Sequence, residues 1–228
     1  MTDTQEKVFR NGEGDAWYRR NRKHLSEYRN DWATWLISSL EGRESITRVC
    51  ELGCANGWRL ARLRPLFSTR CVISGIDVSE EAIADGKKSF PEIELRQGVL
   101  SNLPYKESFD LVIVNFVLHW IDRDMLTRAI AEIDRVVKWN GYLVLGDFLP
   151  DFPTKRHYHH RPGEPIFTYK QDYAEIFRGL GFYKEITRIT FSHDRADARK
   201  DDWIRPTDSD SRGVVSLLHK LPDSYMER

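Results

Sequence analysis

Short apolar runs alternate with amphipathic stretches through the middle of the chain. An apolar run of roughly four to eight residues between turn residues is typical of a buried strand. Five such runs occupy Val49–Leu52, Cys71–Val78, Ile93–Gln97, Phe109–Phe116 and Tyr142–Gly146. The run from Phe109 is nearly continuous, as expected of a strand covered on both faces of a parallel sheet. The alternation of strands and helices predicts a doubly wound α/β domain.

The helices follow from a different spacing. Apolar residues between Leu126 and Val137 step by four, three and four positions, which predicts a helix, and we expect Asn140-Gly141 to end it. The same spacing predicts helices over Glu27–Leu40 and Tyr173–Leu180.

Two closing strands are predicted near Tyr183–Phe191 and Val214–His219, without a helix between them. Strands joined in this way favour antiparallel pairing. The expected fold is therefore a seven-stranded, mostly parallel sheet with an antiparallel edge strand and helices on both faces.

The composition narrows the class of protein. The 228 residues suffice for one sizeable α/β domain, and 35 basic residues balance 35 acidic ones. A neutral chain has no overall field that favours nucleic acid or an anionic membrane, so neither partner is expected. The longest apolar run, Leu111–Ile121, is too short to span a bilayer, and the three cysteines suggest neither disulfides nor zinc. We expect a cytoplasmic protein, monomeric or homodimeric.

The most informative stretch is Val49-Cys50-Glu51-Leu52-Gly53-Cys54-Ala55-Asn56-Gly57. Glycine allows a sharp turn and lets a ligand lie against the backbone. The stretch resembles the first motif of the class I S-adenosylmethionine-dependent methyltransferases, which have a Rossmann-like fold. The resemblance implies that Gly53, with Cys54, Ala55 and Gly57, lies beside the methionyl part of the cofactor, and that Glu51 orients the loop or the ammonium group. Alternatively, the glycine stretch is a turn that only connects a strand to a helix and binds no ligand.

Further along, the resemblance extends to the nucleoside. Asp77, followed by Val78, ends the second strand, where a carboxylate accepts both ribose hydroxyls. The loop from Gly98 to Pro104 is similar to the family's adenine-side loop. It departs from the common pattern at Val99, where many members carry the aspartate that receives the adenine amino group. The backbone of Leu100 and the hydroxyl of Ser101 are then candidate partners of the base.

Two further segments carry weaker resemblance. Asn115-Phe116 matches the position where the family lines the sulfonium, and His119 either touches the acceptor or packs at a helix entrance. Gly14–Asn21 resembles the N-terminal segment of methyltransferases associated with bacterial surface sugars, including pseudaminic acid. That resemblance implies that Tyr18 and an arginine, Arg19 or Arg22, close over the cofactor.

The acceptor side is expected over residues 147–170. Lys155-Arg156-His157-Tyr158-His159-His160-Arg161 is dense in cations and aromatic rings, which favours a small anionic acceptor such as a phosphorylated or nucleotide-linked sugar. A hydroxyl acceptor needs a base, and His157, His159 and His160 are the first candidates, with His119 next. We expect no resident metal at these histidines.

The sequence thus predicts a small-molecule O- or N-methyltransferase, with residues 1–45 as an arm and helix over the cofactor site and residues 46–228 as the methyltransferase domain. A protein or RNA methyltransferase and a binding module without turnover are alternatives. A nicotinamide oxidoreductase is disfavoured because Ala55 stands where its fingerprint needs a glycine. The charged segment 193–212 is a lid, an oligomer contact or a hairpin.

Overall fold

The structure is a computed structural model, and it describes residues 5–26, 31–193 and 209–222. The helices are α1 (Gln5–Val8), α2 (Gly14–Ser26), α3 (Trp32–Ser38), α4 (Trp58–Leu63), α5 (Glu80–Ser89), α6 (Arg123–Val136) and α7 (Tyr173–Gly179), with short turns η1 (Phe9–Glu13), η2 (Arg43–Ser45), η3 (Arg64–Leu66) and η4 (Leu118–Trp120). The strands are β1 (Arg48–Leu52), β2 (Val72–Asp77), β3 (Glu94–Gln97), β4 (Phe109–Asn115), β5 (Val137–Phe148), β6 (Thr154–His157), β7 (Phe167–Lys170), β8 (Tyr183–Ser192) and β9 (Arg212–Lys220).

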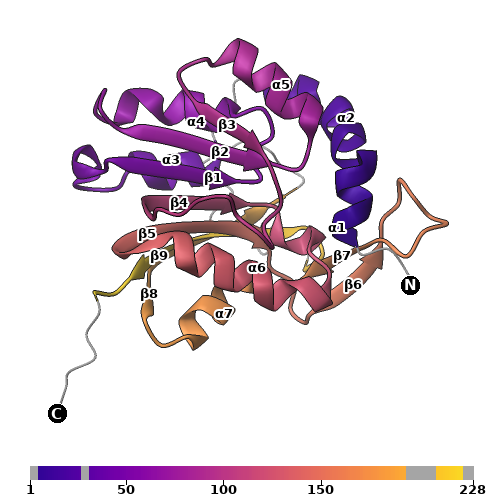
Figure 1. Ribbon diagram of the computed structural model, residues 1–228. Coiled ribbons are helices and arrows are strands. Elements are labelled where there is room, and N and C mark those ends of the chain that lie inside the picture. The colour runs from indigo at the N-terminus through magenta and orange to yellow at the C-terminus, as the bar shows by residue number, and fades with distance from the viewer. Residues whose placement is uncertain (1–4, 27–30, 194–208, 223–228) are drawn as a thin grey trace.

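Seven strands form one twisted sheet in the order β3-β2-β1-β4-β5-β9-β8 (Figure 1). The first five strands of that order are parallel, and β9 runs antiparallel to both β5 and β8. The order reverses direction at β1, since the chain proceeds outward to β3 and then returns to β4. Ligands of doubly wound folds bind beyond the carboxyl ends of the strands at such a switch point. The predicted seven-stranded mixed α/β sheet is confirmed.

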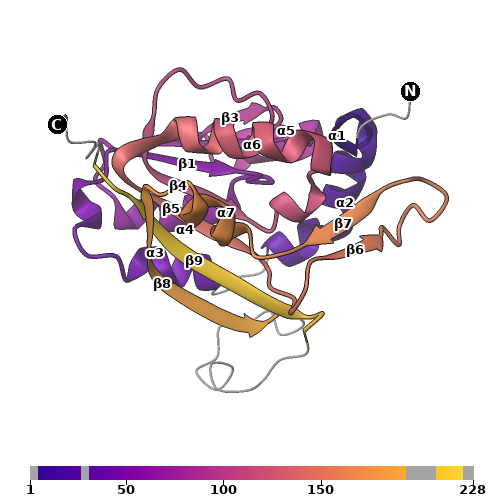
Figure 2. The same cartoon turned by 90° about the horizontal axis from the view of Figure 1, so that it is seen from below.

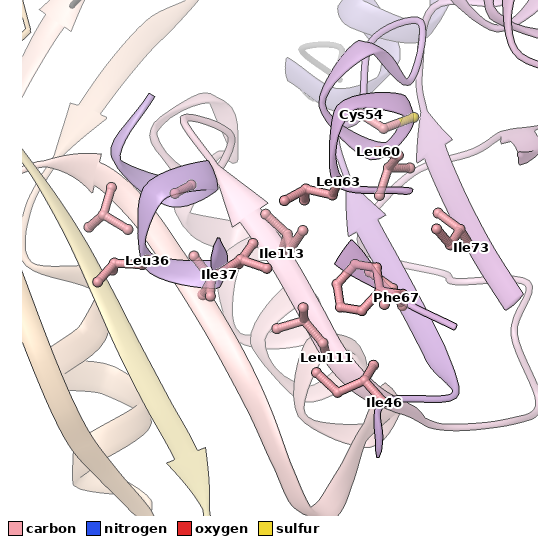
Figure 3. Close-up of a cluster of buried hydrophobic side chains, with 14 of the residues drawn as sticks. Leu36, Ile37, Ile46, Cys54, Leu60, Leu63, Phe67, Ile73, Leu111 and Ile113 are labelled. Carbon is pink, nitrogen blue, oxygen red and sulfur yellow. The ribbon is translucent and has the colours of Figure 1, made fainter. Parts of the chain in front are cut away.

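Helices cover both faces of the sheet. On one face, α3 and α4 bury Leu36, Ile37, Leu60 and Leu63 against β1 and β4 (Figure 3). On the other face, α6 and α7 bury Ile133 and Phe177 with their neighbours, and Figure 1 draws these two helices below the sheet. The central strands β1, β4 and β5 therefore contribute to two apolar cores, which explains why the run from Phe109 is apolar throughout.

The N-terminal arm, residues 5–26, packs across one end of the sheet. Figure 2 shows α1 and α2 beside the β6–β7 hairpin, which stands apart from the main sheet. Gln5 binds the arm to this hairpin. Its side-chain amide donates to the carbonyl of Phe167 at 2.7 Å and accepts from the Phe167 N–H at 2.9 Å. Glu13 accepts a hydrogen bond from the Tyr158 hydroxyl at 2.8 Å.

Some boundaries differ from the sequence prediction. The helix predicted over Glu27–Leu40 begins only at Trp32, because the Asp31 side chain accepts from the Thr34 N–H at 2.8 Å and caps the helix there; residues 27–30 lie outside the described ranges. The prediction that Asn140-Gly141 ends α6 was wrong. The helix ends at Val136, because Val137 is already extended and pairs with Phe109 as part of β5.

Within the described residues, no helix is both long enough and apolar enough to span a bilayer. Most of the predicted 193–212 segment, residues 194–208, lies outside the described residues. Its two ends are held together, since the His193 N–H donates to the Ser211 carbonyl at 2.7 Å.

Candidate active site

A cavity of about 620 Å³ opens at the carboxyl ends of the parallel strands. Its walls come from the loop after β1, the ends of β2 and β4, the loop after β3, and the N-terminal arm. This volume falls within the range of roughly 300–1,000 Å³ usual for small-molecule sites. The cavity therefore lies where the strand order predicts a ligand.

The loop after β1 is shaped by backbone conformation. Gly53 has φ 79° and Gly57 has φ 80°, a left-handed region that favours glycine. The N–H groups of Gly53 and Cys54 both donate to the Ile76 carbonyl, at 2.8 and 3.0 Å, which fastens the loop to β2. Gly53, Cys54 and Ala55 line the cavity.

Asp77 ends β2 and faces this loop. One carboxylate oxygen accepts from the Ala55 N–H at 2.7 Å, and the other accepts from the Ser79 N–H at 2.9 Å. Burial raises the pKa of Asp77, and the backbone donors of Ser79 and Ala55 oppose that rise. Each oxygen keeps further acceptor capacity beyond its backbone donor. Because Asp77 also lines the cavity, its carboxylate is available to a ligand.

A buried ion-pair cluster borders the same loop. The Arg59 guanidinium pairs with the buried Glu51 carboxylate and, at 3.2 Å, with Asp31. Burial acts to lower the pKa of Arg59, but the two carboxylates outweigh it and raise that pKa. Burial raises the pKa of Glu51 to about 7, against the opposing charge of Arg59. Arg59 and Asp31 line the cavity, so a cation and an anion face any ligand that lies beside Gly53.

Aromatic side chains close another part of the cavity. Phe116 has φ 56°, an uncommon conformation for a bulky residue, and strain of this kind clusters at functional sites. This conformation places the Phe116 ring 4.6 Å from the His193 ring and 6.2 Å from the Phe191 ring, measured between centroids. Trp120 lies 5.2 Å from Phe9 of the arm. All five side chains line the cavity.

The structure brings most of the predicted cofactor residues to this cavity. Those in the lining are Gly53, Cys54, Ala55, Asp77, Val78, Val99, Leu100, Asn115 and Phe116. Glu51 and Gly57 are not in the lining: Glu51 forms an ion pair with Arg59, and Gly57 is the N-cap residue that precedes α4.

Tyr18 and the nearby arginines face α5 or solvent. The Tyr18 hydroxyl donates to Asp85, and Arg19 pairs with Glu81 at 2.6 Å on the surface. Arg22 is exposed. None of the three is among the lining residues, although their helix, α2, contributes Trp17 and Asn21 to the wall.

The four histidines predicted as candidate bases also stand apart from the lining. His119 is buried, and its Nδ1 lies 2.9 Å from Asp147. His157 belongs to β6, while His159 and His160 are exposed at the tip of the hairpin. Burial and the nearby Arg20 lower the pKa of His160. Among the described residues, no three potential metal ligands gather into a cluster.

Sequence reasoning placed residues 1–45 over the cofactor site but did not identify which of them line the cavity. Glu6, Phe9, Asp31 and Trp32 do so, and none belongs to a motif. Trp58 and Arg59 also line the cavity, and their position directly after the glycine loop could have predicted this from the sequence.

A family model described as a methyltransferase domain matches residues 50–145, the span that contains the β1 loop, Asp77 and the end of β4. Residues 50–145 of this chain are a methyltransferase domain of the class I, S-adenosylmethionine-dependent type. The predicted fold and the predicted class of domain are confirmed, and the cofactor of this family is S-adenosylmethionine.

Among curated relatives of this chain, an uncharacterized protein of Haemophilus influenzae is 31% identical over 122 residues, which are 50% of this chain and 47% of the relative. An uncharacterized methyltransferase-like protein of Schizosaccharomyces pombe is 32% identical over 60% of this chain and 54% of its own length. The matches thus span about half of these relatives. Trans-aconitate 2-methyltransferase of Shigella flexneri serotype 5b is 26% identical over 90% of this chain and 81% of the relative.

Solved structures share the fold. The 1,6-didemethyltoxoflavin-N1-methyltransferase of Burkholderia thailandensis, with its substrate and S-adenosylhomocysteine bound, aligns with a TM-score of 0.68 at 13% identity, over 97% of this chain and 92% of that one. The N-methyltransferase NodS of Bradyrhizobium japonicum, in complex with S-adenosylhomocysteine, aligns with a TM-score of 0.58 at 17% identity, over 89% and 97% of the two chains.

The donor set of the cavity fits S-adenosylmethionine. The cofactor carries two ribose hydroxyls, a flat base and a zwitterionic amino-acid end. Asp77 offers a carboxylate, Val78, Val99 and Leu100 offer apolar walls, and Asp31 with Arg59 offers both signs of charge.

Proposed function

We propose that this methyltransferase transfers the methyl group of S-adenosylmethionine to oxygen or nitrogen of a small molecule bound at the aromatic part of the cavity. One observation carries the proposal: a single cavity is lined by the glycine loop, by Asp77 and by a wall of aromatic rings. The first two suit a nucleoside with an amino-acid arm, and the third leaves room for a second molecule.

Different residues around the cavity bind different parts of the cofactor. Asp77 accepts the ribose hydroxyls while it holds the Ala55 N–H. Asp31 and Arg59 bind the ammonium and carboxylate ends, and Glu51 keeps Arg59 in place from behind. The division into an arm over residues 1–45 and a domain over residues 46–228 is part of this proposal, because Glu6, Phe9 and Trp17 cover the cavity from the arm.

When bound, S-adenosylmethionine supplies an electrophilic methyl group on its sulfonium. The protein then has to align the acceptor atom with that methyl group and keep water out. Phe116, Trp120 and Phe191 are suited to both tasks, since they are large, apolar and held by contacts with neighbouring rings. His193 belongs to the same wall and adds an imidazole to it, with its ring centroid 4.6 Å from that of Phe116.

The charge of the lining bears on the acceptor. The cations of the hairpin, on which an anionic acceptor was predicted, are engaged elsewhere: Lys155 lies 3.7 Å from the centre of the Phe167 ring, Arg156 pairs with Asp210, and Arg161 pairs with Glu164 at 2.6 Å. The cavity itself is lined by the carboxylates of Glu6, Asp31 and Asp77, against Arg59, which is already paired. We therefore place neutral or basic acceptors first and phosphorylated or nucleotide-linked sugars second.

The test is transfer of label from methyl-labelled S-adenosylmethionine. The chain is incubated with a panel of heterocyclic and aliphatic amines, neutral hydroxy compounds, sugar phosphates, nucleotide-linked sugars, bulk protein and bulk RNA. Label in a small molecule, with equivalent S-adenosylhomocysteine formed, supports the proposal. Label only in protein or RNA would support the macromolecular alternative. Tight cofactor binding without transfer to any acceptor would support a binding module.

A further inference from the structure

The order of the strands sets the order of the subsites along the cavity. β1, β2 and β3 are neighbours, and their carboxyl ends carry Gly53, Asp77 and Gly98 respectively. If the proposed function holds, the ribose binds Asp77 and the amino-acid end extends toward Gly53. The base must then lie on the opposite side of Asp77, beyond the end of β3.

The walls at this end are mostly apolar. Val78, Val99 and Leu100 line the cavity there, and the Gly98 N–H is bound to the Asp77 carbonyl at 2.9 Å. These side chains suit the faces of a flat base. The loop from Gly98 to Pro104 contains no carboxylate, so it offers no charged acceptor to an amino group on the edge of that base.

Glu6 brings a carboxylate to this place from the other end of the chain. It belongs to α1, it lines the cavity, and its carboxylate accepts a hydrogen bond from the hydroxyl of Ser101, the residue after Leu100. Ser101 is buried, so this contact fixes the carboxylate beside the loop. Among the described residues, the Ser101 hydroxyl is the only hydrogen-bond partner of the Glu6 side chain, and a carboxylate has about four acceptor positions.

Neighbouring contacts hold Glu6 in position. The Gln5 N–H donates to Asp122 at 2.9 Å, and the Gln5 side chain is bound to β7. The other two carboxylates in the lining serve elsewhere: Asp31 pairs with Arg59, and Asp77 holds the β1 loop. Glu6 is therefore the lining carboxylate at the base end.

We propose that Glu6 accepts the hydrogen bond of the adenine amino group and so selects adenine. This inference rests on the proposed function. A base with an oxygen in place of the amino group would turn an acceptor toward the carboxylate, leaving both groups without a donor. Sites that hydrogen-bond a ligand group strongly reject an analogue that lacks it, because their buried polar groups are left unpaired.

The experiment compares S-adenosylhomocysteine with S-inosylhomocysteine, in which an oxygen replaces the amino group. Calorimetry gives the ratio of the two dissociation constants for the wild-type chain, for Glu6→Gln, and for Glu92→Gln. Glu92 is an exposed carboxylate in the turn before β3 and serves as the matched control. Thermal melting checks that each variant is folded.

We expect the wild-type chain and Glu92→Gln to prefer the adenosyl ligand by about tenfold or more. Glu6→Gln should lose most of that preference, because the glutamine amide can donate to the oxygen of the analogue. A variant that weakens both ligands equally would show that Glu6 only holds the arm, and an unchanged ratio would likewise overturn the assignment. If the folded wild-type chain binds neither ligand, the proposed function itself fails.

Discussion

The carboxylate of Asp77, at the end of β2, accepts the backbone N–H of Ala55 in the β1 loop at 2.7 Å. The two strands are parallel neighbours, so the loop and the carboxylate meet at the same edge of the sheet. One side chain thus shapes the glycine loop and faces the cavity. In the proposed function this contact couples the geometry of the loop to ligand binding.

Replacing Asp77 with asparagine should weaken both the β1 loop, which Asp77 holds, and the binding of the cofactor. Both carboxylate oxygens accept a backbone N–H, so an amide nitrogen must turn toward one of these donors. Hydrogen bonds to charged groups contribute about 1.5–3 kcal/mol each, so S-adenosylhomocysteine should bind at least roughly tenfold more weakly. Calorimetry measures the affinity, and thermal melting measures the stability.

Asp110 offers a matched control for Asp77→Asn. It also accepts backbone N–H groups, from Thr47 at 2.9 Å and Arg48 at 3.0 Å, but at the opposite end of the sheet. Asp110→Asn should lower the melting temperature without changing the affinity. Equal loss of affinity in both variants would show that Asp77 acts only through stability.

Gly53→Ala should distort the cofactor loop. Gly53 has φ 79°, and a Cβ there would lie 2.3 Å from a methyl carbon of Val117, which also lines the cavity. We expect a stability loss of about 1–3 kcal/mol from backbone strain and a clear loss of affinity for S-adenosylhomocysteine. The control is Gly163→Ala, where no atom lies within 4 Å of the new Cβ. Chemical denaturation and calorimetry on both variants check this, and normal binding by Gly53→Ala would contradict it.

Replacing Arg59 should lower the free energy of unfolding, because its partner Glu51 is buried. Arg59→Met leaves Glu51 fully buried without its counter-charge, and breaking such a pair costs about 3–5 kcal/mol. The double variant Glu51→Gln, Arg59→Met should recover part of that stability in urea unfolding. Purely additive losses would mean that the two side chains do not interact.

Glu51 should also make stability depend on pH. Burial raises its pKa from 4.5 to about 7 in the folded chain, so the folded state binds the proton more tightly than the unfolded state. Its contribution is fully present below pH 4.5 and is lost as the pH rises through about 7. The difference in unfolding free energy between wild type and Glu51→Gln should therefore shift by up to about 3 kcal/mol against the wild type from pH 4.5 to 8. A difference that stays constant with pH would contradict the raised pKa.

The sequence predicted the sheet and most of the residues that line the cavity around the β1 loop, because both depend on local patterns. The run from Phe109 and the glycine loop after Leu52 are each readable within about ten residues. The helix that begins at Trp32 and the end of α6 at Val136 were misplaced. In both cases one capping or pairing contact, at Asp31 and at Val137, decides the boundary.

The contacts of the N-terminal arm were harder to predict because they join segments that are far apart in the sequence. Glu6 meets Ser101, 95 positions away, and Gln5 meets Phe167, 162 positions away. No periodicity carries such information. The cations of the hairpin resembled a ligand site in sequence, yet their partners lie in β7 and in the segment before β9.

The most direct test of the account is calorimetric titration of the wild-type chain with S-adenosylhomocysteine, with the reduced nicotinamide dinucleotide as the comparison ligand. We expect saturable one-to-one binding of S-adenosylhomocysteine and no binding of the dinucleotide. A folded chain that fails to bind S-adenosylhomocysteine, or that binds the dinucleotide instead, would contradict the assignment of this cavity.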